Sequence, residues 1–142
     1  MLNRLVPWRI FLIAFLIHLV WEVAQMPLFK DSELTLVNVY YCVFAAVCDA
    51  AYVLALYWII AKATHDRAWI YRLTGPRVVA VLAAGFVCAA FVEWFALSTG
   101  MWSYNQRMPV LPVLGVGISP LIQLMFLTLA TYWLSARLAG RS

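Results

Sequence analysis

The sequence predicts an all-α integral membrane protein: a four-helix bundle that forms a single transmembrane domain over residues 1–142. Two observations predict this fold class. Of the 142 residues, 66% are hydrophobic and only 11% are charged, which is more apolar surface than a soluble domain of this size can bury. Four apolar stretches also reach the length of about 20 residues that a membrane helix needs: Ile10–Phe29, Val39–Ala61, Val78–Trp102 and Val116–Ala136.

The basic residues predict how the helices are oriented. Eight of the ten precede the first stretch, separate the second from the third, or follow the fourth: Arg4, Arg9, Lys62, Arg67, Arg72, Arg77, Arg137 and Arg141. Because basic loops stay on the cytoplasmic side, both termini are predicted to be cytoplasmic, in a bacterial inner membrane. The net charge of +4 therefore indicates orientation and contact with anionic lipid headgroups, and not nucleic-acid binding.

The first stretch carries polar residues on one helical face. His18, Glu22 and Gln25 follow the spacing i, i+4, i+7, so they share that face. Pro27 is expected to end the helix. The length of the run and its buried polar residues argue against a cleaved signal peptide.

The second stretch has one acidic residue, Asp49, near its middle. Small residues on the same face allow a close helix approach and should turn Asp49 toward the bundle. Tyr57 and Trp58 are expected in the aromatic belt at the cytoplasmic interface. In the loop that follows, Trp69 and Tyr71 are expected to lie along the lipid headgroups, in a short interfacial helix.

The third and fourth stretches repeat the pattern of small and polar residues. Gly85, Ala89 and Glu93 are spaced by four, which predicts that Glu93 faces the bundle and not the lipid. In the fourth stretch Gln123 follows Ser119 by four residues. Pro120 falls in the first turn of that helix, where its missing N–H group is tolerated.

Three of the six acidic residues lie inside membrane spans. Each costs at least about 2.5–3.5 kcal/mol at the bilayer centre, which favours a functional role. Counted from the outer helix ends, the polar residues reach similar depths and predict one pocket in the outer half of the membrane. Its predicted catalytic residues are His18, Glu22, Asp49 and Glu93, with Trp21, Tyr52, Trp94, Trp102, Tyr104 and Gln123 as ligand-binding residues.

Carboxyl groups in an apolar pocket can donate protons, a histidine can relay them, and indole faces can stabilise a cation. With one intramembrane histidine and no second one at ligand spacing, neither a metal nor a cofactor is expected. The alternative is structural: polar side chains also lock membrane helices together through hydrogen bonds. The three cysteines, which lack metal-site spacing, are expected to be small buried residues.

The segment Met101–Gly117 is rich in proline and glycine, so it should hold a fixed irregular shape on the outer side. Val110, Leu111, Val113 and Leu114 are too apolar for open water. This favours a loop that folds back as a lid over the pocket. A simple interface anchor explains the same residues equally well.

The run from Glu93 to Gln123, EWFALSTGMWSYNQRMPVLPVLGVGISPLIQ, resembles the membrane-embedded lycopene cyclase domains of carotenoid biosynthesis. The positions that fit are Gly100, Trp102, Tyr104, Asn105, Pro120 and Leu121. The resemblance implies an isoprenoid substrate that is protonated and cyclised. Ile122 and Gln123 stand where that family has its paired glutamates, so the resemblance implies that this chemistry is lost or moved to Glu93, Glu22 or Asp49.

The six residues IHLVWE, from Ile17 to Glu22, resemble the His-x-x-x-Glu helix of the emopamil-binding sterol isomerase family. In that family the two residues move a double bond by proton transfer, and the resemblance implies this role for His18 and Glu22. Both families bind flat lipophilic isoprenoids and act through carbocations, which is an argument by analogy.

The leading functional hypothesis is an isoprenoid-modifying isomerase or cyclase that protonates a double bond. Glu93 or Glu22 would be the acid, His18 the relay or base, and Asp49, Trp21 and Trp94 would stabilise positive charge. The competing hypotheses are an accessory or assembly subunit of a membrane complex and a small transporter. The expected partners are membrane lipids, a lipophilic small molecule, and further copies of the chain or a larger complex.

Overall fold

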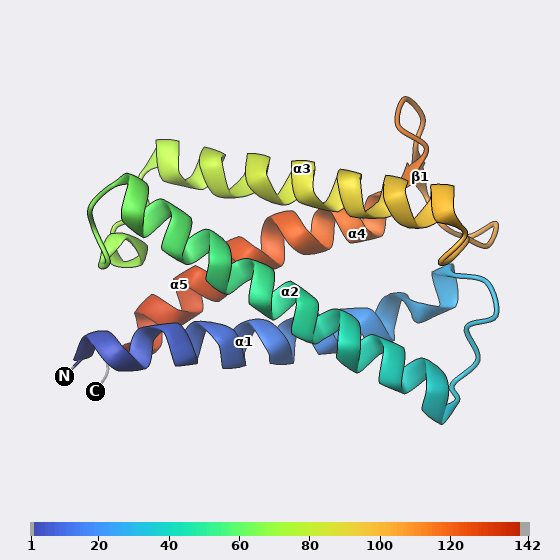
Figure 1. Cartoon of the computed structure of the whole chain (residues 1–142), viewed down its shortest axis with the longest axis horizontal. Helices are drawn as coiled ribbons and strands as arrows, with labels where there is room; N and C mark the ends of the chain where they lie inside the picture. The colour runs from blue at the N-terminus through green and yellow to red at the C-terminus, as the bar shows by residue number, and fades with distance from the viewer. Residues whose placement is uncertain (1, 140–142) are drawn as a thin grey trace.

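The computed structural model describes residues 2–139. These residues form five α-helices, three short turns and two short strands: α1 (Leu2–Gln25), the 3-10 turn η1 (Met26–Leu28), α2 (Leu36–Ala63), the 3-10 turn η2 (Trp69–Tyr71), α3 (Gly75–Thr99), β1 (Val110–Leu111), β2 (Val116–Gly117), α4 (Ile118–Ile122), the π-helical turn η3 (Gln123–Leu127) and α5 (Thr128–Ala139). The last three helical segments follow one another without a break and act as the fourth helix of the bundle (Figure 1).

Four helical segments are long and apolar enough to cross a membrane, as in a multi-pass membrane protein: Leu5–Leu28, Leu36–Ala63, Gly75–Thr99 and Ile118–Ala139. The structure is mostly helical, and the antiparallel pair β1–β2 is a minor exception to the predicted all-α class. Both termini and the α2–α3 connection lie at one end of the bundle, and the loop with β1 and β2 lies at the other (Figure 1).

The predicted helix boundaries shift by a few residues because hydropathy locates the apolar stretch and not the helix ends. The first helix begins at Leu2 instead of Ile10, and its α-helical part ends at Gln25, with Pro27 in the following 3-10 turn. The third begins at Gly75 and ends at Thr99, where Gly100 caps it in the left-handed conformation with φ 72°. Such a C-cap favours glycine.

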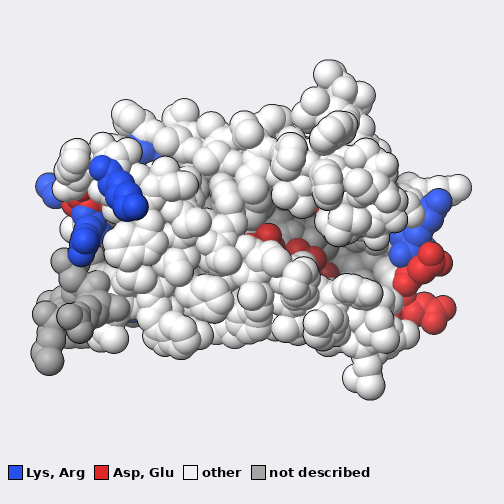
Figure 2. Space-filling view, in the orientation of Figure 1, with Lys and Arg blue, Asp and Glu red and all other residues white. Residues whose placement is uncertain are grey.

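The charged residues gather at the two ends of the molecule and leave the middle of this face white apart from a few acidic atoms (Figure 2). Lysine and arginine side chains mark the end that holds the termini (Figure 2). At that end Arg77 and Arg72 flank Asp66, with nitrogen–oxygen distances of 3.2 and 3.7 Å. Arg141, which also served to predict the orientation, lies outside the described residues.

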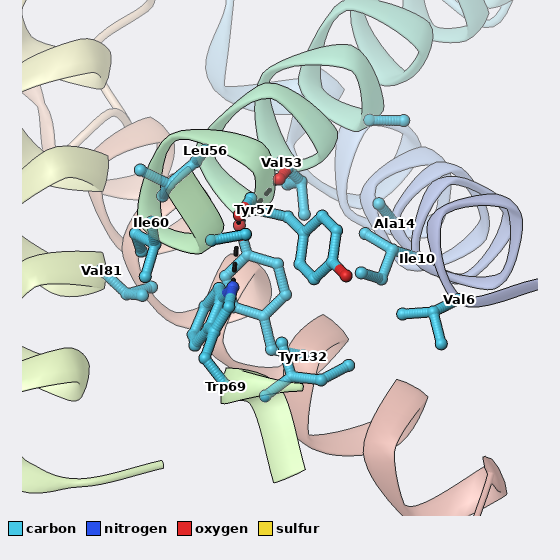
Figure 3. Close-up of a cluster of buried hydrophobic side chains, with 13 residues drawn as sticks. Val6, Ile10, Ala14, Val53, Leu56, Tyr57, Ile60, Trp69, Val81 and Tyr132 are labelled. Carbon is cyan, nitrogen blue, oxygen red and sulfur yellow. Dashed lines mark hydrogen bonds between the residues drawn. The ribbon is translucent and has the colours of Figure 1, made fainter. Parts of the chain in front are cut away.

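An aromatic core fills the terminus end of the bundle (Figure 3). Trp69 is fully buried between Tyr57 and Tyr132, with ring centroids 6.0 and 4.8 Å away. Its indole N–H donates to the Tyr57 carbonyl at 3.2 Å, and the Tyr132 hydroxyl donates to the Val53 carbonyl at 2.7 Å. Both polar groups named here donate to backbone carbonyl oxygens, so the hydrogen-bonding needs of these two side chains are met inside the core.

Two predictions for this end are wrong. Trp69 does not lie along the headgroups, and Tyr57 does not lie in the interface belt, because both are buried. The reason is that η2 packs against α5, which places the Trp69 indole inside the aromatic core. Trp58, which the sequence predicts for the same belt, is half-buried, and the Arg67 guanidinium lies 5.6 Å from its ring centroid.

The helices do not all pack on one another. α1 packs along α2 and against α5, while α3 packs on α4, η3 and α5. α2 and α3 make little direct contact with each other. One side of the bundle is therefore less tightly closed than the others.

Candidate functional site

Five polar side chains from three helical segments form one hydrogen-bonded group, here called the glutamine cluster: His18, Glu22, Gln25, Asp49 and Gln123. His18 Nδ1 lies 3.0 Å from Asp49 Oδ2. The Gln123 amide nitrogen lies 2.7 Å from Glu22 Oε1 and 2.8 Å from Asp49 Oδ2. The cluster thus links α1, α2 and η3 in the half of the bundle away from the termini.

The orientation of both glutamine amides follows from their partners. The Trp21 indole N–H can only donate, and it points at Gln25 Oε1 over 3.2 Å. Ser119 Oγ donates to the same oxygen at 2.8 Å. Gln25 must therefore present its nitrogen to Gln123 Oε1, 2.7 Å away. The Gln123 amide nitrogen then faces the acidic residues as a donor.

This orientation also assigns the proton on His18. The Gln123 amide has two hydrogens, and its two nearest acceptors are the carboxyl oxygens of Glu22 and Asp49. His18 Nδ1 is farther from that nitrogen, at 3.3 Å. No amide hydrogen is left for Nδ1, so with an ionised Asp49 the Nδ1 atom carries its own hydrogen and donates to Asp49.

A second polar group, here called the Glu93 site, consists of Glu93, Trp102 and Tyr104. The buried Glu93 side chain on α3 accepts hydrogen bonds on Oε2 from the Tyr104 hydroxyl and, at 3.3 Å, from the Trp102 indole. The Tyr104 oxygen in turn accepts the backbone N–H of Gly117 at 2.8 Å. Among residues 2–139, no side chain or backbone group donates to the other oxygen, Oε1 of Glu93.

The Tyr104 phenol lies in the loop between α3 and β1. Burial and the hydrogen bond to Glu93 raise the pKa of Tyr104 well above its usual range near 10. The tyrosine is therefore a neutral donor over the whole physiological range, and Glu93 Oε2 always has a partner. A Cβ at position 117 would lie 3.2 Å from Tyr104 Cζ, so a side chain there would require Tyr104 to shift by a few tenths of an ångström.

The segment around Tyr104 is fixed to the end of the first helix. Asn105 Nδ2 donates to the Pro27 carbonyl at 2.6 Å, and the Lys30 N–H donates to the Ser103 carbonyl at 2.9 Å. The Phe29 ring makes edge contacts with Trp102 and Tyr104, at centroid distances of 6.4 and 5.6 Å. The Glu93 site is therefore closed from the outer end by residues 102–105.

The rest of that loop behaves differently. β1 and β2 form a hairpin that projects away from the helices (Figure 1), and Val113 near its tip is 91% exposed. Val110 and Leu114 are also exposed. The expectation that these four apolar residues fold back onto the bundle is wrong for the tip, whereas Leu111 and Val116 pack against the cluster around Ala89.

The π-helical turn η3 places Gln123. A π turn inserts an extra residue into a helix and is frequent at functional sites. Its backbone lies directly on α3, where a Cβ at Gly85 would come within 2.8 Å of the Leu124 carbonyl oxygen. Only glycine permits this approach, so Gly85 fixes the position of the turn that carries Gln123.

Acidic atoms are visible at the bottom of a hollow in the middle of one face (Figure 2). The hollow lies between α2 and α3, which make little direct contact with each other. The Asp49 side chain is 22% exposed, although His18 beside it is fully buried. The Gln123 amide nitrogen bridges the Glu22 and Asp49 carboxyl groups, whereas Trp102 and Tyr104 hold the Glu93 carboxyl group separately.

The structure brings most of the predicted site residues together, in the two groups above. Tyr52 packs against both the aromatic core and the cluster around Ala89, and its hydroxyl is buried. Trp94 is not brought in: it is 57% exposed and contacts the Phe91 ring on the outer surface of α3. Trp94 follows Glu93 directly, and neighbouring residues on a helix point about 100° apart.

Gln25 and Ser119 make the interhelical hydrogen bonds expected of polar side chains that lock membrane helices together, since they join α1 to η3 and α4. Gln25 shares the His18 face at i+7, so its helical phase was a usable signal. The π turn and the role of Gly117 had no sequence signal. Among residues 2–139, no group of three or more His, Cys, Asp or Glu side chains is placed to hold a metal ion.

Comparisons of the chain with protein-family models, with curated proteins and with solved structures give no match. The function proposed below therefore depends on the glutamine cluster, the Glu93 site and the hollow between α2 and α3.

Proposed function

We propose that this chain binds a lipophilic, unsaturated ligand of the isoprenoid type in the hollow and transfers a proton to it. The observation that carries the proposal is the position of the acidic residues. They lie inside an apolar bundle, at the bottom of a hollow between α2 and α3. A hollow on the side of a membrane helix bundle opens to lipid, so a lipid-soluble ligand can enter without crossing water.

The division of the carboxyl groups into two sites suits an isomerisation. One carbon of a double bond takes a proton from the Glu93 site, and the neighbouring cation then loses a different proton to the glutamine cluster. Atoms and charge balance, and no oxidant or reductant is needed. Separate acidic and basic sites for the two proton transfers are what such a reaction requires.

Within this scheme Glu93 is the acid. Tyr104 and Trp102 hold Oε2, which leaves Oε1 to carry the proton toward the ligand. Glu22 and Asp49 take the leaving proton and stabilise the cation, with His18 as the relay. Trp21 and Tyr52 supply the aromatic rings beside the ligand in this scheme. Trp94 does not, because its side chain is mostly exposed on the outer surface of α3.

The resemblance to lycopene cyclase domains fits this scheme if the acid is Glu93 and not the residues at positions 122 and 123, where that family has its paired glutamates. Ile122 is exposed and Gln123 donates to the acidic residues, so neither supplies a proton. Cyclisation remains the alternative outcome of the same protonation, since a cation that is not deprotonated can be attacked by another double bond.

The membrane setting is part of the proposal. The termini and most basic residues share one end (Figure 2), which by the positive-inside rule is the cytoplasmic end of a bacterial inner membrane protein. The glutamine cluster then lies in the outer half of the bilayer. Lipids, a lipophilic ligand and other copies of the chain are its partners in this proposal.

Deuterium labelling tests the proton transfer. Protein in native lipid discs is incubated in D2O, and the extracted lipids are analysed by mass spectrometry. We expect one co-purifying unsaturated lipid to gain deuterium with wild type and with Glu33→Gln, a control in the exposed outer loop. Glu93→Gln and Glu22→Gln should stop the incorporation and still fold. Equal labelling in all four samples, or none in wild type, would contradict the proposal.

A second candidate function is an accessory subunit, and Gln123 favours it. Its amide binds residues of α1 and α2 from the fourth helix, as a purely structural lock would do. In that case the chain co-purifies with fixed protein partners in constant ratio, and no lipid is labelled. A transporter, the third candidate, would instead show substrate flux in liposomes.

A further inference from the structure

The hairpin formed by β1 and β2 has a buried base and an exposed apolar tip. Met108 and Val116 at the base are buried, whereas Val113 and Leu114 at the tip are exposed. None of the side chains of residues 108–117 contains a nitrogen or oxygen atom. Contiguous exposed apolar surface of this kind marks contact with a partner or with lipid.

The hairpin holds its shape through its own backbone. Pro109 and Pro112 restrict the chain and have no N–H group to satisfy. Gly115 turns the chain with φ 67°, a conformation that favours glycine. The N–H groups of Leu114 and Gly115 both donate to the Leu111 carbonyl, at 3.2 and 2.8 Å. These backbone donors are therefore absent or used within the hairpin, which suits surroundings that are poor in water.

The position of the hairpin beside α3 indicates what surrounds the tip. The hairpin leaves the bundle beside the last turns of α3 and points across the helix direction, on the side of α3 away from the other helices (Figure 1). Over these turns α3 exposes the rings of Phe91, Trp94 and Phe95. Because α3 is long and apolar enough to cross a membrane, these rings face lipid, and the hairpin tip extends the same apolar surface sideways.

We propose that the tip of the β1–β2 hairpin inserts into phospholipid, at the boundary between headgroups and acyl chains, in the leaflet opposite the termini. The hairpin lies across the helices, so it enters this layer from the side of the bundle. Arg107, which directly precedes the apolar residues, is exposed. Its guanidinium suits the phosphate groups of the headgroups, while the tip lies against the acyl chains.

The inserted hairpin is joined to the Glu93 site. The Gly117 N–H donates to the Tyr104 hydroxyl at 2.8 Å, and the Ile118 N–H donates to the Pro109 carbonyl at 2.8 Å. The segment that returns from the lipid therefore also holds Tyr104 and begins α4. This inference goes beyond the proposed function, because insertion requires neither a bound ligand nor a proton transfer.

Spin labelling tests the insertion. A nitroxide is attached at Val113→Cys, in a chain whose native cysteines, Cys42, Cys48 and Cys88, are replaced by alanine. The protein is placed in liposomes of phosphatidylcholine and phosphatidylglycerol. Collisions with oxygen, which dissolves in lipid, are compared with collisions with a nickel chelate, which stays in water. We expect oxygen to relax this label severalfold more strongly than the chelate does.

Glu33→Cys is the matched control, because Glu33 is exposed in the α1–α2 loop at the same end of the bundle. Its label should respond mainly to the chelate, and a label at Phe91→Cys gives the lipid reference. A label on Val113→Cys that responds to the chelate like the control would overturn the proposal. Protection from both reagents, or spectral broadening by a second nitroxide, would also overturn it, since the tip would then lie on protein.

Photocrosslinking replaces spin labelling if the chain without native cysteines does not fold. Benzoylphenylalanine is placed at position 113 or at position 33 of the otherwise wild-type chain, which is irradiated in the same liposomes. We expect a mass increase of one phospholipid for position 113 and none for position 33. No lipid adduct at position 113, or equal yields at both positions, would contradict insertion. Deuterium labelling of lipid is a separate measurement, so either proposal can fail alone.

Discussion

The two halves of the bundle bury polar groups in opposite ways. At the terminus end, the hydroxyl of Tyr132 and the indole of Trp69 bond to backbone carbonyls and leave large apolar rings to fill space. In the other half, His18, Asp49 and Gln123 bond mainly to one another. The first pattern stabilises the fold and brings no titratable side chains together for proton transfer. The second places titratable groups in contact, and it makes the bundle depend on their hydrogen bonding.

The comparison predicts that the aromatic core carries more of the stability than the polar half does. Trp69→Ala should lower the free energy of unfolding by about 3–5 kcal/mol, because it removes a fully buried ring. Reversible unfolding in mixed micelles, followed by circular dichroism, measures this. Trp94→Ala is the control, since that ring is mostly exposed. Equal losses in the two variants would break the comparison.

Gly85→Ala tests the contact between α3 and the backbone of the π turn. The new Cβ would overlap the Leu124 carbonyl oxygen and Met125 Cα, both 2.8 Å away, so the turn must move and the free energy of unfolding should fall by about 1–3 kcal/mol. Gly75→Ala is the matched control, because no atom lies within 4 Å of its Cβ position. The same unfolding assay compares them, and a neutral Gly85→Ala would show that η3 is not held by this contact.

Gln123→Leu tests the polar half directly. It removes the donor shared by Glu22 and Asp49 and leaves the Gln25 amide without its acceptor, at a cost of about 1–3 kcal/mol. Glu22→Gln should be much milder, since its side-chain oxygen still accepts from Gln123. If the two variants unfold alike, the carboxylate charge matters more to stability than the hydrogen bonds do.

Tyr104→Phe should have the smallest effect on stability. It deletes the hydroxyl that joins Glu93 to Gly117, which is worth about 0.5–1.5 kcal/mol. The raised pKa of Tyr104 adds a pH signature. The neutral phenol stabilises the fold below pH 10, and that contribution declines as pH rises above this value. Unfolding measured against pH should therefore fall less steeply above pH 10 in Tyr104→Phe than in wild type.

The four membrane-length helices could be predicted because apolar stretches of about 20 residues have few other uses. The convergence of His18, Glu22, Asp49 and Gln123 could also be predicted, from helical phase and depth. The burial of Trp69 could not, because its loop is polar and aromatic, and only packing of η2 on α5 shows where the ring lies. The outward position of Trp94 was already implied by its place beside Glu93.

The division into two groups also had no sequence signal. Glu93 lies at a depth similar to that of Glu22, but it takes both of its hydrogen bonds from Trp102 and Tyr104 in the loop. Periodicity relates residues on one helix, and it does not say which loop residue will reach a given carboxyl group. The orientation of the glutamine amides is likewise a property of the whole network.

The π turn gives the fourth helix a change of phase. Because each residue of an α-helix advances about 100°, a segment with one extra residue rotates everything before it relative to everything after it. α4 and α5 therefore face different neighbours than one continuous α-helix would allow. Deleting a single residue from Gln123–Leu127, such as the exposed Phe126, would restore the ordinary repeat. That deletion would turn Gln123 away from the carboxyl groups and leave α5 in its place.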